Sequence, residues 1–183
     1  MLKVTLRPLN DYDLPLLLAW AWIPQVWEYS PTWRNSGNLT WEEHNEWFHT
    51  KREWRSDWII EVDDMDTSWA TRPVGVVHVT DLNTDHPEIG LYIAEILLWG
   101  NRIGRRALEL AMEQVKESRL WAVIHPMNKR SIKLFTGLGF NKVGKARKEQ
   151  DLYELRFNTP GELEVPISQY QERYRRSYQP VPA

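Results

Sequence analysis

The spacing of hydrophobic positions divides the N-terminal half of the chain into short strands and two helices. Residues 4–8 predict a strand that Pro8 ends, and residues 14–22 predict a helix capped by Asn10 or Asp11. A second helix is predicted over residues 41–54, because Thr40 and Glu43 match a capping box. Residues 25–38 between the helices predict irregular chain. Alternating apolar positions then predict three strands, over residues 57–62, 74–80 and 88–93.

The C-terminal half carries stronger helical periodicity. An amphipathic helix is predicted to follow Gly104, and a buried strand over residues 120–124. A further helix begins at Asn128 and ends at two glycines, and residues 140–145 and 152–157 predict a final antiparallel pair. The predicted fold class is α+β, with a mixed, mostly antiparallel sheet of about six to seven strands flanked by helices. We expect one domain over residues 1–158 and a polar C-terminal tail over residues 159–183.

Composition narrows the function classes. The apolar share of 42% supports a substantial core, and the net charge of −2 argues against a general nucleic-acid binder. The absence of cysteine excludes disulfides, cysteine-ligated zinc and thiol nucleophiles. The apolar runs are too short to cross a bilayer and the N-terminus lacks a signal-peptide pattern, so we expect a cytoplasmic protein with no membrane partner.

Tryptophan is concentrated in one third of the chain. Of eleven tryptophans, nine lie between Trp20 and Trp69. One interpretation is a large aromatic core. The other is an aromatic-walled pocket or a partner surface. The two interpretations are compatible.

The strand–loop–helix segment over residues 88–115 is the main candidate for binding chemistry. Its loop ends at a helix N-terminus, where unpaired N–H groups and the helix dipole favour a pyrophosphate. Asn101, Arg102 and Arg105 add donors and positive charge. The segment is neither a P-loop nor a GxGxxG fingerprint. The alternative interpretation is an ordinary turn with a solvated basic face.

A second segment, HPMNKRSIKLFTGLGF, follows a buried strand. Together with WGNRIG and the opening VTLRPLNDYDLPLL, it resembles the GNAT superfamily of acetyltransferases over roughly residues 3–157. Within that family the chain is most similar to the branches that modify ribosomal proteins and nucleotide-linked amino sugars. The resemblance implies the GNAT fold, and transfer of an acetyl group from acetyl-CoA directly to a primary amine.

The resemblance also implies roles for individual residues. A strand running beside the pantetheine arm would expose the N–H of Tyr92 or Ile93 to the thioester carbonyl. Asn128 would contact the same arm. The pyrophosphate would be wrapped by Trp99, Gly100, Asn101, Arg102, Ile103 and Gly104, with help from Arg105.

Two positions depart from the family pattern. Arg102 stands where the family has its middle glycine, and Phe135 stands where a tyrosine often protonates the leaving thiolate. Since Phe135 has no proton to give, Ser131 is the candidate donor; otherwise it is a helix-surface serine. Glu88 is the first candidate to accept the amine's proton and His78 the second. A strand-end charge and a structural histidine are the alternative interpretations.

The tryptophan-rich third is where acceptor choice is expected. The string LTWEEHNEWF resembles the branch that acetylates the 4-amino group of nucleotide-linked sugars. Trp33, Trp41 and His44 would then stack on a base or a sugar ring, unless they only pack their helix on the sheet. A protein N-terminus and an aminoglycoside are competing acceptors. His44 and His49 do not share a helix face, and we predict no metal site.

Two other classes compete with an enzyme. A non-catalytic acyl-CoA-binding module is motivated by Arg102 and Phe135. Nucleic-acid binding ranks third, because basic patches in this fold more often contact cofactor phosphates, and we expect no nucleic-acid partner. The expected partner is a small-molecule or peptide amine. Tyrosines and arginines in the tail suggest a homodimer contact.

Overall fold

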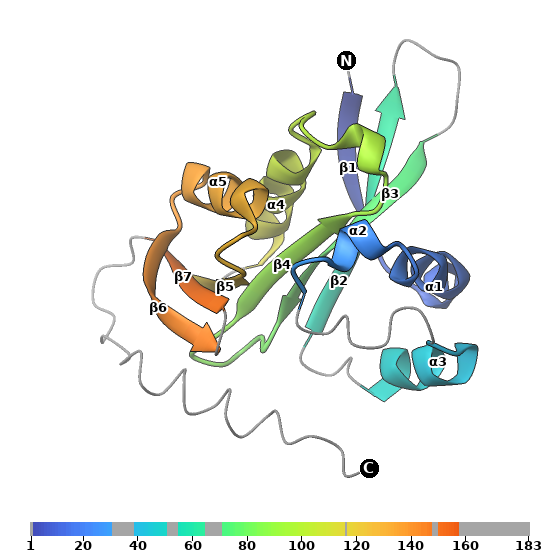
Figure 1. The fold of residues 1–183 in the computed structure, drawn as a ribbon, viewed down its shortest axis with the longest axis horizontal. Coiled ribbons are helices and arrows are strands. Elements are labelled where there is room, and N and C mark those ends of the chain that lie inside the picture. The colour runs from blue at the N-terminus through green and yellow to red at the C-terminus, as the bar shows by residue number, and fades with distance from the viewer. Residues whose placement is uncertain are drawn as a thin grey trace.

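Seven strands form one sheet in the order β1-β2-β3-β4-β5-β7-β6 (Figure 1). The computed structural model describes residues 2–30, 39–50, 55–64, 71–115, 117–147 and 150–157. The strands are β1 (Leu2–Pro8), β2 (Arg55–Asp64), β3 (Arg72–Thr80), β4 (Glu88–Ile93), β5 (Arg119–Ile124), β6 (Asn141–Arg147) and β7 (Gln150–Arg156). The helices are η1 (Asp11–Asp13), α1 (Leu14–Ala21), α2 (Pro24–Trp27), α3 (Trp41–Thr50), η3 (Ile96–Leu98), α4 (Ile103–Gln114) and α5 (Lys129–Gly137).

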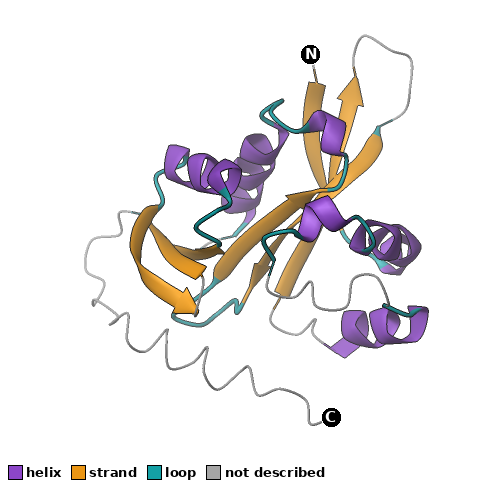
Figure 2. Cartoon of the chain, in the orientation of Figure 1, coloured by secondary structure: helices purple, strands orange, loops and turns teal. Residues whose placement is uncertain are grey.

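The pairing confirms the predicted fold class. Neighbouring strands are antiparallel except β4 and β5, which run parallel. Figure 2 shows α4 and α5 on one side of the sheet and α1 to α3 on the other. The result is an α+β protein whose single parallel strand pair lies near the middle of the sheet.

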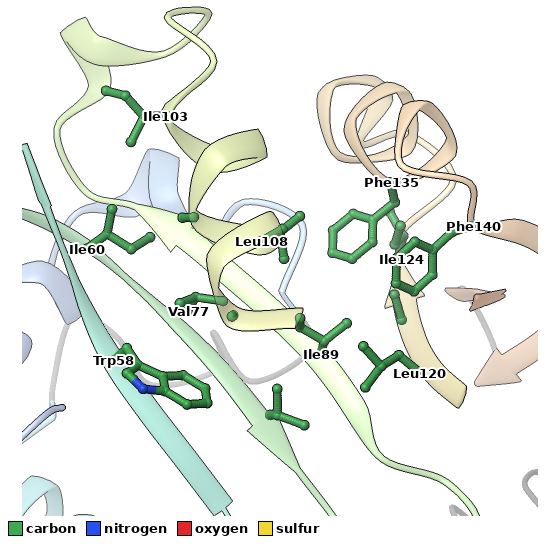
Figure 3. Close-up of a cluster of buried hydrophobic side chains, with 14 of the residues drawn as sticks. Trp58, Ile60, Val77, Ile89, Ile103, Leu108, Leu120, Ile124, Phe135 and Phe140 are labelled. Atoms are coloured by element: carbon green, nitrogen blue, oxygen red, sulfur yellow. The ribbon is translucent and has the colours of Figure 1, made fainter. Parts of the chain in front are cut away.

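Successive side chains of a strand point to opposite faces of the sheet, so each face contributes to a hydrophobic core of its own. The main core lies between the sheet and the two C-terminal helices, where Trp58, Val77 and Ile89 meet Leu108 of α4 (Figure 3). The smaller core joins Trp20 and other α1 residues to Ile59 and Val76 on the opposite face. Both faces of the central strands are therefore covered, and each strand position projects toward a defined helical layer.

The N-terminal elements are held to the sheet by a buried carboxylate. Asp13 accepts hydrogen bonds from Arg7 at 2.8 and 2.7 Å, and Arg7 Nε also donates to Glu61 at 2.8 Å. Burial alone raises the pKa of Asp13, but the hydrogen bonds from Arg7 and from the Asn10 N–H lower it below its usual range. The Asn10 side chain caps η1 and not the helix over residues 14–22 for which it was predicted, because α1 begins after Asp13 without a side-chain cap. These contacts fix the start of α1 relative to β1 and β2.

The structure corrects one prediction in the irregular segment. Pro24 begins a short helix, α2, which the sequence analysis did not predict. Proline suits the first helical position because its missing N–H is unpaired there in any case. The predicted helix over residues 41–54 is described as far as Thr50. Trp33 and the proposed tail over residues 159–183 lie outside the described ranges.

The tryptophans between Trp20 and Trp69 include both buried and exposed side chains. Trp20 and Trp58 are core residues, whereas Trp22 and Trp41 are exposed. None of the helices in the described ranges has the length and hydrophobicity that crossing a bilayer demands. The tryptophan-rich third therefore supplies both core and surface.

Candidate active site

A gap opens between the two parallel strands. β4 and β5 are paired only at Glu88 and Trp121, where the Trp121 N–H donates to the Pro87 carbonyl at 2.8 Å. Beyond that point β4 continues along β3, and β5 continues along β7. The carboxyl ends of β4 and β5 therefore lie at the same edge of the sheet, where the two strands are no longer paired with each other.

The hydrogen bonds of β4 identify the backbone groups that face the gap. The Ala94 N–H donates to the Val74 carbonyl on β3 at 2.8 Å, and the Tyr92 carbonyl lies against Gly75 of the same strand. Polar groups on a strand alternate in direction, so those of Ile93 point away from β3. Consistently, the Ile93 carbonyl accepts the Trp99 indole N–H at 2.9 Å. Of the two predicted donors, the geometry favours Ile93 over Tyr92.

The loop after β4 leads into a helix N-terminus, a feature that favours anions in general. Gly100 and Arg102 have positive φ values of 90° and 61°. α4 begins at Ile103 without a side-chain cap, so its first N–H groups lack intrahelical partners. The bond from Trp99 to Ile93 ties this loop to the end of β4. Unpaired N–H groups and the positive end of the α4 dipole therefore lie at the end of the loop that follows β4.

The two arginines of this loop differ in their contacts. Arg102 is exposed, and its left-handed conformation explains why glycine suits the position in the family. Arg105 donates to Glu109 at 3.0 Å and to the Gly137 carbonyl at 3.1 Å. Arg105 therefore joins α4 to the end of α5, while the side chain of Arg102 remains at the surface.

The turn between β5 and α5 forms the other wall. Asn128 caps α5, its Oδ1 accepting the Ser131 N–H at 3.1 Å. The Asn128 N–H donates to the His125 carbonyl at 2.9 Å, which closes the turn. Ser131 is half-buried in the first turn of α5. Phe135 is buried and packs edge-to-face on Phe140, with ring centroids 5.0 Å apart, so its ring belongs to the main core.

The structure brings both predicted proton acceptors to one face of the sheet. Glu88 lies opposite Thr80, and His78 lies opposite Gly90, two residues along β4. Glu88 is half-buried at the narrow end of the gap. The His78 ring covers Gly90, because a Cβ there would lie 2.7 Å from His78 Nε2. Both side chains face the α1 to α3 side.

His78 is a half-buried base that is neutral at pH 7. Burial lowers the pKa of His78 to about 4; Arg55 lowers it further, and Asp57 partly opposes this. Nδ1 of His78 is buried and has no hydrogen-bond partner within the described ranges. At neutral pH the His78 ring is therefore unprotonated and can accept a proton, but it is a weak base.

Two of the predicted acceptor-binding residues lie elsewhere. His44 is buried between α3 and α1, where burial lowers its pKa and a hydrogen bond to the backbone of Leu14 partly opposes that effect. Its ring stacks on Trp47 at 5.9 Å. Trp41 is exposed on α3. Among the described residues, the contacts of His44 are with Leu14 and Trp47 and not with β4 or β5.

Two aromatic residues that the sequence analysis did not single out contact residues on either side of the gap. Trp27 of α2 packs on Tyr92 with centroids 4.9 Å apart, and Tyr29 packs on His125 at 5.5 Å. Trp27 Nε1 donates to the Trp20 carbonyl at 3.0 Å, which fixes α2 on α1. These residues lie in the segment predicted to be irregular. Its density of aromatic residues was the signal that pointed to it.

Comparisons with known proteins agree with this geometry. The chain is 41% identical over 156 residues to an uncharacterized protein of Methanocaldococcus jannaschii, covering 84% of this chain but 31% of that protein. A solved domain from Methanocaldococcus jannaschii has a TM-score of 0.77 at 40% identity, covering 85% of this chain and 99% of the domain.

A more distant structure has the same fold. Spermidine N-acetyltransferase from Vibrio cholerae, solved with CoA and spermine, has a TM-score of 0.64 at 17% identity, covering 85% of this chain and 96% of that one. The model of the acetyltransferase (GNAT) domain family matches residues 3–141. This chain therefore belongs to the GNAT acetyltransferase family.

Proposed function

We propose that this protein transfers an acetyl group from acetyl-CoA directly to a primary amine. The observation that carries the proposal is the divergence of β4 and β5 toward an edge that also holds the uncapped start of α4 and Asn128. An extended thioester arm fits between separated strands that still have backbone groups to pair. The pyrophosphate suits the adjacent N–H groups of residues 103–105.

The same geometry supports a way to activate the thioester. The Ile93 N–H faces the gap, as the alternation along β4 requires, and would donate to the thioester carbonyl as negative charge develops there. Trp99 holds the Ile93 carbonyl and so restrains this end of the strand. Attack by the amine nitrogen forms the new C–N bond.

The attacking nitrogen must also lose a proton. Glu88 is our first candidate to accept it, directly or through a water, and His78 is the second. Both lie on the α1 to α3 face, opposite the layer that contains α4 and α5. Without cysteine in the chain, and with no evident Ser–His pair, we propose no acetyl-enzyme intermediate.

For the acceptor we propose a nucleotide-linked amino sugar. The support is the LTWEEHNEWF resemblance, together with aromatic side chains at the gap that suit a ring. Trp27 and Tyr29 are better situated to contact it than Trp41 or His44. A protein N-terminus or an aminoglycoside is the alternative acceptor, and a non-catalytic acyl-CoA-binding module is the alternative of another class.

Titration calorimetry with acetyl-CoA, and with CoA for comparison, tests the cofactor site. Arg102→Glu places a carboxylate beside the proposed pyrophosphate site and is expected to weaken binding at least tenfold. Arg106→Glu makes the same charge change one turn into α4 and is the matched control. No binding of acetyl-CoA at millimolar concentration would refute the proposal, as would equal losses in both variants.

Turnover is then tested by thiol release with a panel of amines led by nucleotide-linked amino sugars. Glu88→Gln is expected to lower kcat and shift its pH profile if Glu88 is the base, and His78→Gln tests the second candidate in the same assay. Acetyl-CoA binding without thiol release for any amine would favour the non-catalytic module. Radiolabelled acetyl trapped on the protein without acceptor would contradict direct transfer.

A further inference from the structure

Breaking the thioester leaves a thiolate that needs a proton, and Phe135 cannot supply one. We propose that Tyr29, which approaches from the acceptor side of the gap, donates this proton. The inference rests on the proposed function and adds a catalytic residue to it. Four observations support it: the position of Tyr29, the rigidity of its neighbour His125, a chain of contacts across the gap, and the chemistry of the other donors.

Tyr29 reaches the far side of the gap although it follows α2. Its ring lies 5.5 Å from that of His125, at an interplanar angle of 31°. His125 directly follows β5, and Trp27, two residues before Tyr29, packs on Tyr92 of β4 at 4.9 Å. The segment from Trp27 to Tyr29 thus passes from one diverging strand to the other. The Tyr29 ring therefore packs on the residue that directly follows β5.

Hydrogen bonds hold His125, the residue on which the Tyr29 ring packs. The His125 carbonyl accepts the Asn128 N–H at 2.9 Å, and its Nδ1 accepts the Met127 N–H at 3.2 Å. Pro126 occupies the second position of this turn, where a fixed φ favours it. Both the backbone and the ring of His125 are therefore held in the turn that carries Asn128. A donor packed on this ring is positioned relative to the proposed cofactor contact.

A chain of contacts connects Tyr29 to the proposed carbonyl donor. Arg130 lies over the Trp99 ring, 4.6 Å from its centroid, and Trp99 Nε1 is bonded to the Ile93 carbonyl. Arg130 is also close enough to Tyr29 to lower the pKa of its phenol, although the hydrogen bond to Glu28 outweighs this and raises the pKa overall. Ile93, Trp99 and Arg130 are therefore joined by direct contacts, and the charge of Arg130 acts on Tyr29.

The other hydrogen-bond donors named around the gap suit the step less well. A serine hydroxyl such as that of Ser131 is a much weaker acid than a phenol. Nδ1 of His125 is already engaged, because it accepts the Met127 N–H. The charges of Arg55 and Asp57 shift the pKa of the Tyr92 phenol. Both residues belong to β2, which lies on the side of β4 away from β5. A phenol has an ordinary pKa of about 10, which Glu28 raises in Tyr29, against about 8.5 for a thiol, so the proton moves to sulfur only as the C–S bond breaks and negative charge develops there.

The step balances as follows. The amine nitrogen bonds to the thioester carbon, and the carbonyl electron pair moves to oxygen, where the Ile93 N–H stabilises it. When that pair returns, the C–S bond breaks and sulfur takes its electrons together with the Tyr29 proton. The phenolate recovers a proton from solvent, and the proposed base removes the proton of the nitrogen. The products are the amide and CoA with a free thiol.

The thiol of bound CoA reports on this contact without an acceptor. Its ionisation is followed by ultraviolet absorbance in complexes of the wild type, Tyr29→Phe and Ser131→Ala, with desulfo-CoA complexes as blanks for tyrosine ionisation. A phenol that donates to the thiolate stabilises it, so we expect the thiol pKa to be higher by about one pH unit or more in Tyr29→Phe. We expect Ser131→Ala to match the wild type.

The outcomes separate the two proposals. CoA that does not bind the wild type refutes the proposed function, and the inference with it. CoA that binds but has the same thiol pKa in Tyr29→Phe as in the wild type overturns the inference alone. A higher thiol pKa in Ser131→Ala, with none in Tyr29→Phe, assigns the donor to Ser131 and also overturns it.

Leaving-group dependence distinguishes proton transfer from acceptor binding. We expect Tyr29→Phe to lower kcat with acetyl-CoA about a hundredfold. The loss should be much smaller with an acetyl thioester of an acidic aryl thiol, which leaves without a proton. Equal losses with both donors would mean that Tyr29 serves only to bind the acceptor, contrary to the inference.

Discussion

Replacing His78 by glutamine should change how stability depends on pH. The ordinary pKa of histidine is 6.5, and burial lowers that of His78 to about 4 in the folded protein. Between these two values the unfolded chain binds a proton that the folded protein does not. Stability therefore falls as the pH decreases from 6.5 to 4 and is unaffected by this group above 6.5.

The magnitude follows from the same two values. Their difference corresponds to about 3.4 kcal/mol at 25 °C. This is an upper limit, because the histidine is half-buried as a whole even though its Nδ1 is buried. Since glutamine does not titrate, the wild type should lose up to this amount relative to His78→Gln between pH 7 and pH 4.

The assay is urea unfolding of both proteins at half-unit steps of pH, comparing the difference in the free energy of unfolding. Groups common to both proteins cancel in this difference. His49→Gln, which removes an exposed histidine from α3, is the matched control. A difference that stays constant from pH 7 to pH 4 would show that His78 is hydrated or paired in the folded protein, and the reasoning from burial would be wrong.

Three further predictions concern stability. Gly75→Ala inserts a methyl group against a backbone carbonyl of β4 and should cost about 1–3 kcal/mol, or several degrees in Tm, whereas Gly137→Ala meets only the end of a flexible side chain at 3.4 Å and should be tolerated. Asp13→Asn should cost about 2 kcal/mol near neutral pH, and the deficit should shrink in acid, because the lowered pKa of Asp13 contributes stability that is lost as the pH falls below its ordinary value of 3.8. Arg102→Gly should be neutral or stabilising by up to about 1 kcal/mol, because glycine adopts the left-handed conformation without strain. Arg106→Gly inside α4 should cost about 1 kcal/mol. Thermal melts that rank these two variants in the opposite order would refute the argument from φ.

Local sequence signals predicted most of the regular elements. The three strands predicted over residues 57–62, 74–80 and 88–93 correspond to β2, β3 and β4. Asn128 caps α5 as expected, because capping depends on a few adjacent residues. The sequence analysis missed α2 because none of its four residues is buried. Such a segment has no hydrophobic periodicity that would indicate a helix.

Predictions of side-chain surroundings were less successful. His44 lies at a position with helical spacing, and that spacing cannot distinguish a buried packing residue from a ligand contact. Its burial against α1 depends on how two helices meet. Tyr29 and His125 are far apart in sequence, and nothing in either segment indicates the contact between them.

The sequence alone determined the family, the order of the main elements and the two turns at which a pyrophosphate and a pantetheine arm are expected. These features depend on local capping, glycine positions and periodicity. The tertiary structure decided how far β4 and β5 remain paired, which of two neighbouring N–H groups faces the gap, and which aromatic side chains border it. The physical reason is that periodicity encodes which face of an element is apolar, whereas what lies against that face depends on packing between distant segments.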